Sequence, residues 1–402
     1  MPKTAAIIAE FNPFHNGHKL LIDRVRECTG ADYVIAIMSG DYVQRGVPAI
    51  TDRQVRATMA LLNGIDLVLS YPVRYCTSSA ESFSDHAVRI IDRLGIVDYL
   101  AFGSECGDIA LLNDTAASLL NETDEYKAAL REGLKSGLAY PAARARALPA
   151  FADVLEGPNN ILGIEYIKAL RRIGSSIVPF TIPREGASHL DEESIQTLSS
   201  AAAVRRAMAR GTHIPGLDKA LPPDAFDILR SDIGLYGVTS EADFSLLLAD
   251  RLWRIDSRHV YAQFADVTDD LANAILKKRI QYQNFTDFAE RLKTKNLTRT
   301  HTNRALLHIV LDIRKEPENM TDNLYAHVLG FRKDKEELLG LIKEKTSLPL
   351  VTRASKAAEI LSGQALKLFE EENRVSNLYE TVRAQKSGEP FRNVLTKPII
   401  VV

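Results

Sequence analysis

The feature that most constrains the fold is the alternation of short apolar runs with helical patterns in the first half of the chain. Strands are predicted at residues 5–9, 33–38, 66–70, 99–103 and 176–182. Helices are predicted between and after them, at residues 19–28, 53–62, 79–94, 161–173 and 199–210, with a further helical region at 111–152. The apolar runs are continuous, which is typical of strands covered on both faces. This order predicts an α/β fold with a doubly wound, Rossmann-like parallel sheet.

The pattern changes after a segment rich in Gly and Pro at residues 211–223. From residue 224 to about 345 it is mostly helical, and the remainder predicts a short strand at 348–351 and two helices. A chain of 402 residues is too long for one ordinary core. We therefore expect an α/β domain at 1–215 and a mainly α-helical domain at 216–402.

Composition limits the classes of partner and compartment. The net charge is −2, so binding to nucleic acid requires a local basic patch. No apolar run is long enough to cross a bilayer, and the N-terminus does not resemble a signal peptide, so we expect a cytoplasmic protein without membrane contact. Cys28, Cys76 and Cys106 show neither zinc-ligand nor disulfide spacing. We expect them to be free thiols in a reducing compartment.

The segment that carries the chemistry is Ala9-Glu10-Phe11-Asn12-Pro13-Phe14-His15-Asn16-Gly17-His18, between the first strand and the first helix. Ligands of doubly wound sheets bind at the carboxyl ends of strands, and a helix N-terminus there offers N–H groups to phosphate. Gly17 permits a close approach of the backbone. His15 and His18 can both face phosphates and stabilise charge during adenylyl transfer. The alternatives are a simple helix cap and a zinc site, but no third zinc ligand is evident, so no metal site is predicted.

Several separated segments extend this motif into a family resemblance. The sequence resembles the bacterial tRNA(Met) cytidine acetate ligase family of the nucleotidylyltransferase superfamily. The resemblance rests on residues 10–18, Met38-Ser39-Gly40, Gln44-Arg45-Gly46, Phe102-Gly103-Ser104-Glu105 and Pro158-Asn159-Asn160-Ile161-Leu162-Gly163. It implies two steps. ATP and acetate first give acetyl-adenylate and pyrophosphate, and the acetyl group then passes to N4 of the wobble cytidine of elongator tRNA(Met).

The resemblance also implies which residues hold ATP. Mg²⁺ is expected to accompany the triphosphate, and no protein ligand is assigned to it. The expected ATP contacts in the first motif are Ile7, Ile8, Ala9, Glu10, Phe11, Asn12, Pro13, Phe14, His15, Asn16, Gly17, His18, Lys19 and Leu20. Beyond it, Gly103 leaves room for the nucleotide, Asn160 or Asn159 hydrogen-bonds it, and Arg184 with Glu185 reaches the phosphates or adenine. The alternatives are a turn glycine, a helix cap and a surface charge.

Two further segments are candidates for the reacting groups. In the loop after the second predicted strand, Gln44 and Arg45 are expected to bind acetate or shape its pocket, and Asp41 to orient the incoming amine. With His15 and His18, Asp41 and Arg45 form the predicted catalytic set. The run 199–205 resembles the serine-rich helix start, with a later arginine, that many nucleotidylyltransferases use on phosphates. The alternative is a serine-capped helix.

A basic segment in the second half is the candidate RNA-binding surface. Residues 271–315 contain ten basic and three acidic residues, a local excess of seven positive charges. Tyr282 and Phe285 lie among them and are candidates for stacking on bases. The residues expected to contact RNA are Lys277, Lys278, Arg279, Lys293, Lys295, Arg299 and Arg304. The alternative is a solvated helix face.

Two rival functions are compatible with the same motif. One is a nucleotidylyltransferase that adenylylates a phosphorylated small molecule, which leaves the basic helical half unexplained. The other is a nucleotide-sensing RNA-binding protein without turnover, which does not need both His15 and His18. The sequence predicts no oligomeric state.

Overall fold

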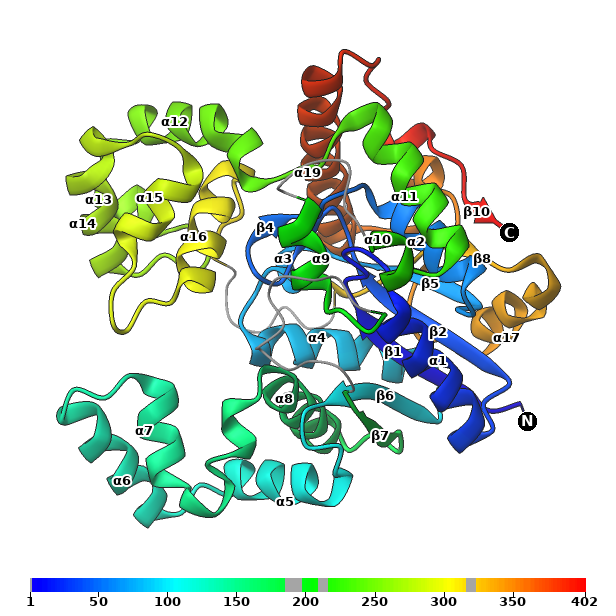
Figure 1. Cartoon of the computed structure of the whole chain (residues 1–402), viewed down its shortest axis with the longest axis horizontal. Helices are drawn as coiled ribbons and strands as arrows, with labels where there is room; N and C mark the ends of the chain where they lie inside the picture. The colour runs from blue at the N-terminus through cyan, green and yellow to red at the C-terminus, as the bar shows by residue number, and fades with distance from the viewer. Residues whose placement is uncertain (1, 185–196, 209–215, 316–322) are drawn as a thin grey trace.

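The computed structural model describes residues 2–184, 197–208, 216–315 and 323–402. An eight-stranded sheet lies at its centre, in the order β10-β8-β5-β2-β1-β6-β7 with β9 paired to β8 (Figure 1). Its strands are β1 (Thr4–Ala9), β2 (Tyr33–Ser39), β5 (Leu67–Tyr71), β6 (Tyr99–Ser104), β7 (Val178–Pro183), β8 (Ala326–Phe331), β9 (Leu350–Val351) and β10 (Ile400–Val401). A separate antiparallel hairpin is formed by β3 (Tyr42–Val43) and β4 (Val47–Pro48).

Helices cover both faces of the sheet, as expected for a doubly wound fold. One face packs against α1 (Asn16–Thr29), α2 (Arg53–Leu62), α9 (Ala201–Met208), α10 (Leu217–Ala220) and α11 (Pro223–Tyr236). The other packs against α4 (Ala80–Arg93), α5 (Ile109–Leu120) and α8 (Pro158–Ile173). Alternate residues of β2 enter the two cores: Val34 and Ala36 belong to the first and Ile35 and Ile37 to the second.

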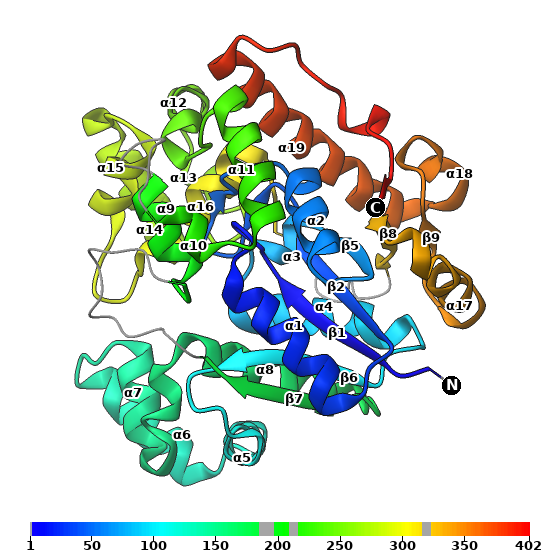
Figure 2. The same ribbon diagram turned by 45° about the vertical axis from the view of Figure 1, so that its right-hand side comes forward.

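Two helical lobes stand beside the sheet (Figures 1 and 2). One contains α6 (Asp124–Lys135) and α7 (Tyr140–Ala147), and the other contains η3 (Glu241–Phe244), α12 (Ser245–Arg254), α13 (Arg258–Tyr261), α14 (Asp269–Lys278), η4 (Arg279–Gln281), α15 (Phe285–Leu292) and α16 (Arg299–Leu311). We call the second one the basic lobe. The long helix α19 (Gly363–Ser387) supplies Val375 and Tyr379 to the core of this lobe.

The remaining elements are short or peripheral. They are α3 (Val73–Cys76), η1 (Pro149–Phe151), η2 (Val154–Glu156), η6 (Lys333–Lys335), α17 (Glu337–Lys345), η7 (Ala354–Lys356), α18 (Ala357–Ile360) and η8 (Val394–Thr396). No helix in the described ranges is long and apolar enough to cross a membrane.

The predicted α/β class with a helical C-terminal region is confirmed, but the sheet is mixed rather than wholly parallel. The five strands predicted in the first half pair in parallel, whereas β8 runs antiparallel to β5. The sequence analysis missed β8 because a short apolar run in a helical context does not reveal its pairing with β5, about 260 residues away. Long-range pairing is a tertiary effect. Strands β8, β9 and β10 bring the C-terminal part into the N-terminal sheet. The boundary near residue 215 stays a prediction, and it does not separate the sheet from everything that follows.

Candidate active site

The start of α1 places His15 and His18 side by side at the carboxyl end of β1. His15 is the N-cap, and its Nδ1 accepts a hydrogen bond from Gly17 N at 3.0 Å. In return His18 Nδ1 accepts one from His15 N at 3.2 Å, and the two rings stack with centroids 3.7 Å apart. Because each Nδ1 accepts a backbone N–H, the hydrogen of each neutral ring lies on Nε2. The pair is therefore arranged as two hydrogen-bond donors at a helix N-terminus.

Burial keeps both rings neutral. It lowers the pKa of His15 to about 3, with further lowering from the charges of Arg184 and Arg205. The pKa of His18 is also held well below its usual value, first by burial and then by His15 and Arg184. Neutral imidazoles beside two arginines form an electropositive, donor-rich site, which suits a triphosphate.

The depressed pKa of His15 predicts a loss of stability in acid. The unfolded chain binds a proton at His15 near pH 6.5 and the folded chain only near pH 3, so this group's contribution is present above pH 6.5 and is lost as the pH falls. Between pH 6.5 and 5.0, the loss for one histidine is about 2 kcal/mol. We expect His15→Asn, which can retain the cap, to reduce the difference in unfolding free energy between pH 7.5 and 5.0 by about that amount. Urea unfolding at the two pH values measures it.

His259 provides the control for this experiment because its side chain is exposed. We expect His259→Asn to leave the pH dependence as in the wild type. Equal pH dependence in His15→Asn and the wild type would show that His15 is not held neutral.

The predicted ATP-binding stretch divides into lining and supporting residues. Ile7, Phe11 and Phe14 are buried in the core, so their side chains support the motif. That the stretch from Ile7 to Leu20 holds ATP stays a prediction. The Phe11 ring packs edge-on against His18, with centroids 5.0 Å apart. Ile8, Ala9, Glu10, Gly17, His18 and Leu20 are only partly buried, whereas Asn12 and Pro13 are buried.

Two polar residues of the same stretch have partners of their own. Asn16 Nδ2 donates to the backbone oxygens of Thr197 at 3.1 Å and Lys219 at 2.7 Å. Lys19 forms an ion pair with Asp23, one turn later on α1, at 2.5 Å. The Asn16 contacts fix the start of α1 to its surroundings, whereas the Lys19 pair lies within the helix. Lys19 therefore points along the helix surface in the structure.

Arg56 is a residue of the site that the sequence analysis missed. It is fully buried, and its guanidinium donates to the backbone oxygens of Glu10, Ser39, Gly40 and Thr51. It thereby joins the segment after β1 to the segment after β2. The available signal was its position within the predicted helix 53–62, where Arg53, Arg56, Ala57 and Ala60 have the spacing of one helix face.

Asp41 is not placed on an open rim. Its side chain is buried, its Oδ1 accepts a hydrogen bond from Arg53 N at 2.8 Å, and its Oδ2 lies 3.8 Å from Arg53 Nε. The prediction that Asp41 orients an incoming amine disagrees with this placement, because the carboxylate faces the start of α2. The loop was predicted without its tertiary contacts, and a short Asp is readily drawn to free backbone N–H groups at a helix start.

Arg45 lies exposed on the β3–β4 hairpin, close to the motif. Gln44 N donates to Glu10 Oε1 at 3.1 Å, which ties the hairpin to the segment after β1. Gly46 has a φ of 73°, and a Cβ there would lie 2.3 Å from Arg304 N, in the middle of α16. The hairpin is therefore held between the motif and the basic lobe, which places Arg45 between them.

The other side of the motif is formed by the ends of β6 and β7. The side chain of Arg184 crosses Gly103, since a Cβ on Gly103 would lie 3.1 Å from Arg184 Cγ. Arg205, from the predicted serine-rich helix, reaches the motif and donates to Asn12 O at 2.6 Å. Glu185 lies outside the described residues. The structure thus brings Gly103, Arg184 and Arg205 to the two histidines.

Asn160 has a structural task in this arrangement. Its Oδ1 accepts hydrogen bonds from Glu105 N and Cys106 N at 2.9 and 3.1 Å, and its Nδ2 donates to Val154 O. The neighbouring Asn159, which is partly buried, donates from Nδ2 to Glu105 Oε1 at 2.6 Å. The side chain of Asn160 therefore holds the loop after β6. It is not the helix cap given as the alternative, because Gly157 is the N-cap of α8 and has no side-chain capping bond. Direct contact with the nucleotide stays a prediction.

Comparison with known proteins decides the family. The family model described as HIGH nucleotidyl transferase matches residues 2–392. A tRNA(Met) cytidine acetate ligase from Thermoanaerobacter sp. is 40% identical over 382 residues, which cover 93% of this chain and 94% of that protein. One from Acetivibrio thermocellus is 34% identical over the full length of both chains. The chain belongs to the tRNA(Met) cytidine acetate ligase family.

Solved structures agree with this membership. The crystal structure of Thermotoga maritima TmcAL bound with alpha-thio ATP has a TM-score of 0.89 and 30% sequence identity, covering 100% of this chain and 99% of that one. The apo form of the same protein has a TM-score of 0.91 and 31% identity, with the same coverage.

In this member of the tRNA(Met) cytidine acetate ligase family, the predicted RNA-binding residues differ in their exposure to solvent and in the partners they already have. Lys277, Lys293 and Lys295 are exposed, whereas Lys278, Arg279 and Arg299 are partly buried. Lys293 pairs with Glu290 at 3.2 Å, and Arg299 pairs with the same carboxylate at 2.7 Å. Arg279 pairs with Asp256 at 2.5 Å. Lys278 donates to Arg291 O.

Arg304 and Phe285 are corrections to the predicted RNA surface. Arg304 is buried and forms an ion pair with Asp266 at 2.9 Å, so it stabilises the basic lobe from within. Phe285 is 1% exposed and belongs to the core of the lobe. Tyr282 is partly buried and donates to Ser245 O at 2.7 Å. Charge and aromatic content in the sequence do not show which side of a helix is buried, which explains these errors.

Proposed function

We propose that this chain is an ATP-dependent ligase that acetylates N4 of the wobble cytidine in elongator tRNA(Met), giving N4-acetylcytidine. The observation that carries the proposal is the pair of neutral imidazoles, His15 and His18, at the start of α1. Family membership supports the choice of tRNA(Met) as the acceptor, since the relatives are named tRNA(Met) cytidine acetate ligases. The reaction takes place in the cytoplasm.

The first step joins acetate to AMP. A carboxylate oxygen of acetate attacks the α-phosphorus of ATP, the bond to the bridging oxygen of pyrophosphate breaks, and acetyl-adenylate and pyrophosphate result. His15 and His18 donate through Nε2 to phosphate oxygens, and the N-terminus of α1 adds backbone N–H groups. Arg184 and Arg205, whose charges act on His15, offset the negative charge of the leaving pyrophosphate. Arg45, on the hairpin tied to Glu10, binds the acetate.

The second step transfers the acetyl group. The N4 amine of cytidine attacks the acetyl carbon, AMP leaves with the oxygen that came from acetate, and the amine loses a proton. The exocyclic amine is a weak nucleophile, so an activated mixed anhydride is needed, and exclusion of water protects it. Mg²⁺ bound to the triphosphate would reduce its charge. No group of three His, Cys, Asp or Glu side chains suited to a metal occurs in the described ranges, and we assign the ion no protein ligand.

One exchange assay distinguishes the proposal from its rivals. The protein is incubated with ATP and labelled pyrophosphate, with and without acetate, in the absence of RNA. We expect label to enter ATP only when acetate is present. Exchange that requires a phosphorylated acceptor would instead identify a nucleotidylyltransferase, and tight ATP binding without exchange would identify a nucleotide sensor. Either result would contradict the proposal.

The basic lobe is expected to act in the second step only. Reversing the charge of the exposed residues Lys293 and Lys295 should lower kcat/KM for tRNA about tenfold or more, and reduce the salt dependence of tRNA binding by about two units of slope. Acetate-dependent exchange without RNA should not change. Acetyl transfer and exchange are measured on the same preparations.

The control for this pair is charge reversal at Lys333 and Lys343, which are both exposed. They belong to the region around α17, which lies on the opposite side of the sheet from the basic lobe (Figure 1). We expect these variants to resemble the wild type in both assays. If exchange and transfer fell together in the Lys293 and Lys295 variant, the assignment of separate tasks to the two parts would be wrong.

A further inference from the structure

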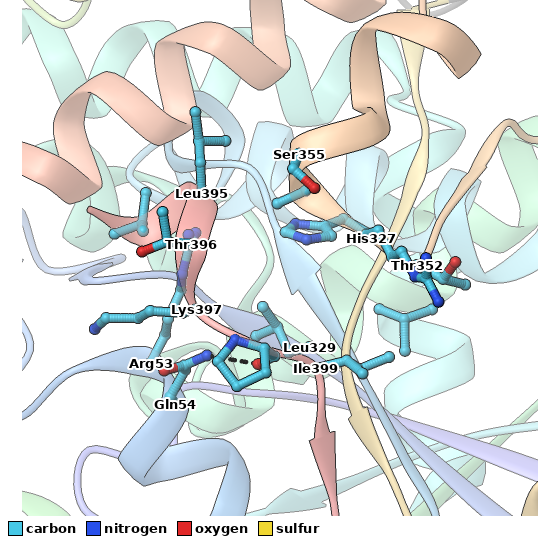
Figure 3. A pocket seen from close by; sticks show the side chains of 15 residues that line it. Arg53, Gln54, His327, Leu329, Thr352, Ser355, Leu395, Thr396, Lys397 and Ile399 are labelled. Atoms are coloured by element: carbon cyan, nitrogen blue, oxygen red, sulfur yellow. Dashed lines mark hydrogen bonds between the residues drawn. The ribbon is translucent and has the colours of Figure 1, made fainter. Parts of the chain in front are cut away.

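A pocket of about 480 Å³ lies beside β8, and no residue of α1 lines it. Four separate segments form its walls: the start of α2, strand β8, the segment after β9, and the C-terminal tail around η8 (Figure 3). Gln54 Nε2 donates to Pro398 O at 3.0 Å and fastens the tail over the start of α2. The volume is within the range of about 300–1,000 Å³ that is typical of pockets for small molecules.

The charged side chains that line this pocket are all positive. Its lining includes Arg53, Arg353 and Lys397, and none of the described residues that line it is acidic. Arg53 forms an ion pair with Glu372 at 3.0 Å. Lys397 forms ion pairs with Asp52 at 3.1 Å and with Glu380 at 2.8 Å. Arg353 differs from both, because no acidic side chain in the described ranges lies within ion-pairing distance of it. It lines the pocket and is also exposed to solvent.

His327 supplies an unpartnered polar group in the wall. It is 5% exposed, and its Nδ1 is buried with no hydrogen-bond partner in the described part of the chain. Burial lowers the pKa of His327 to about 3, with a smaller effect from the charge of Arg53, so the ring is neutral. A buried polar atom without a partner costs free energy, and such groups commonly mark a place where a ligand or water completes the hydrogen bonds.

The other lining groups describe the ligand. Thr352, Ser355 and Thr396 bring hydroxyl groups, while Leu329, Leu395 and Ile399 form apolar walls (Figure 3). We propose that this pocket binds a small organic anion, a carboxylate or a phosphate monoester attached to an apolar body. Arg353 meets the charge, His327 and the hydroxyl groups complete the hydrogen bonds, and the apolar body lies against the leucines and Ile399. This site is separate from the proposed ATP site and does not depend on the proposed function.

Calorimetric titration of the full chain tests the site with four probes: octanoate and phenyl phosphate, which have an apolar body, and acetate and inorganic phosphate, which do not. We expect one molecule of octanoate or phenyl phosphate to bind per chain, more tightly than the small ions. Binding of octanoate alone identifies a carboxylate ligand, and binding of phenyl phosphate alone identifies a phosphate ester. We expect Arg353→Gln to weaken binding at least tenfold. Lys356→Gln is the matched control, because Lys356 is exposed nearby but does not line the pocket.

A second measurement follows the histidine. In protein labelled with ¹⁵N at histidine, the signal that disappears in His327→Gln should shift when the probe is added, and a saturating ATP analogue should not abolish that shift. The proposal is overturned if no probe binds, if Arg353→Gln binds as tightly as the wild type, or if the ATP analogue displaces the probe. It is also overturned if Arg353→Gln weakens tRNA binding and leaves probe binding unchanged, since Arg353 would then be an RNA contact.

Discussion

Replacing His18 with alanine should lower acetate-dependent exchange of pyrophosphate into ATP by about 100- to 1000-fold, which is the usual effect of losing one donor at a site of developing charge. The change removes the Nε2 donor and also the Nδ1 that accepts from His15 N at 3.2 Å. His15 then loses its stacking partner at 3.7 Å. Exchange rates at saturating ATP and acetate measure the effect.

Two controls separate chemistry from folding in this prediction. His259→Ala removes an exposed imidazole elsewhere and should keep the wild-type rate. The free energy of unfolding of His18→Ala should be within about 1–2 kcal/mol of the wild type, because the change affects one cap on one helix. A His18→Ala protein that exchanges at the wild-type rate would contradict the role given to this imidazole.

Replacing Arg56 with methionine should have the largest effect on stability, a loss of about 3–5 kcal/mol in the free energy of unfolding. The backbone oxygens of Glu10, Ser39, Gly40 and Thr51 would lose their donors inside the protein. Since Glu10 and Gly40 belong to the two segments beside the histidine pair, exchange should also fall at least tenfold. Urea unfolding and the exchange assay measure the two effects.

Arg24 offers a matched comparison on the surface, where it pairs with Glu27 at 2.9 Å and both side chains are more than half exposed. Arg24→Met should cost less than about 1 kcal/mol. Arg56→Lys, which keeps the charge but has fewer donors, should be intermediate. If Arg56→Met were no less stable than Arg24→Met, the buried guanidinium would not be joining the two segments.

The parts of the fold that depend on local pattern were predictable from the sequence. The helix predicted at 53–62 has the same bounds in the structure, and the strand predicted at 33–38 differs by one residue. Continuous apolar runs and the spacing of apolar residues in helices are local properties, so they can be recognised in the sequence without tertiary information. The placement of His15 and His18 was also predictable, because it follows from a strand end and a helix start that are adjacent in the chain.

The parts that depend on distant contacts were not predictable. Strand β8 pairs with β5, which is distant in the sequence, and the six residues of β8 do not indicate which strand they pair with. Asp41 and Arg304 were expected to act on ligands because their residue types suit such roles. In the folded chain Asp41 instead contacts Arg53, and Arg304 pairs with Asp266. Burial of a charged side chain is decided by tertiary packing, which a charge pattern does not contain.

The most direct test of the account follows the oxygen atoms of acetate. Acetate labelled with ¹⁸O at both positions is supplied with ATP and elongator tRNA(Met), and AMP is analysed by mass spectrometry after a single turnover. If acetate attacks the α-phosphorus and the amine then attacks the acetyl carbon, one ¹⁸O atom appears in AMP for each N4-acetylcytidine formed. Unlabelled AMP, or label in inorganic phosphate, would contradict activation of acetate as an adenylate at this site.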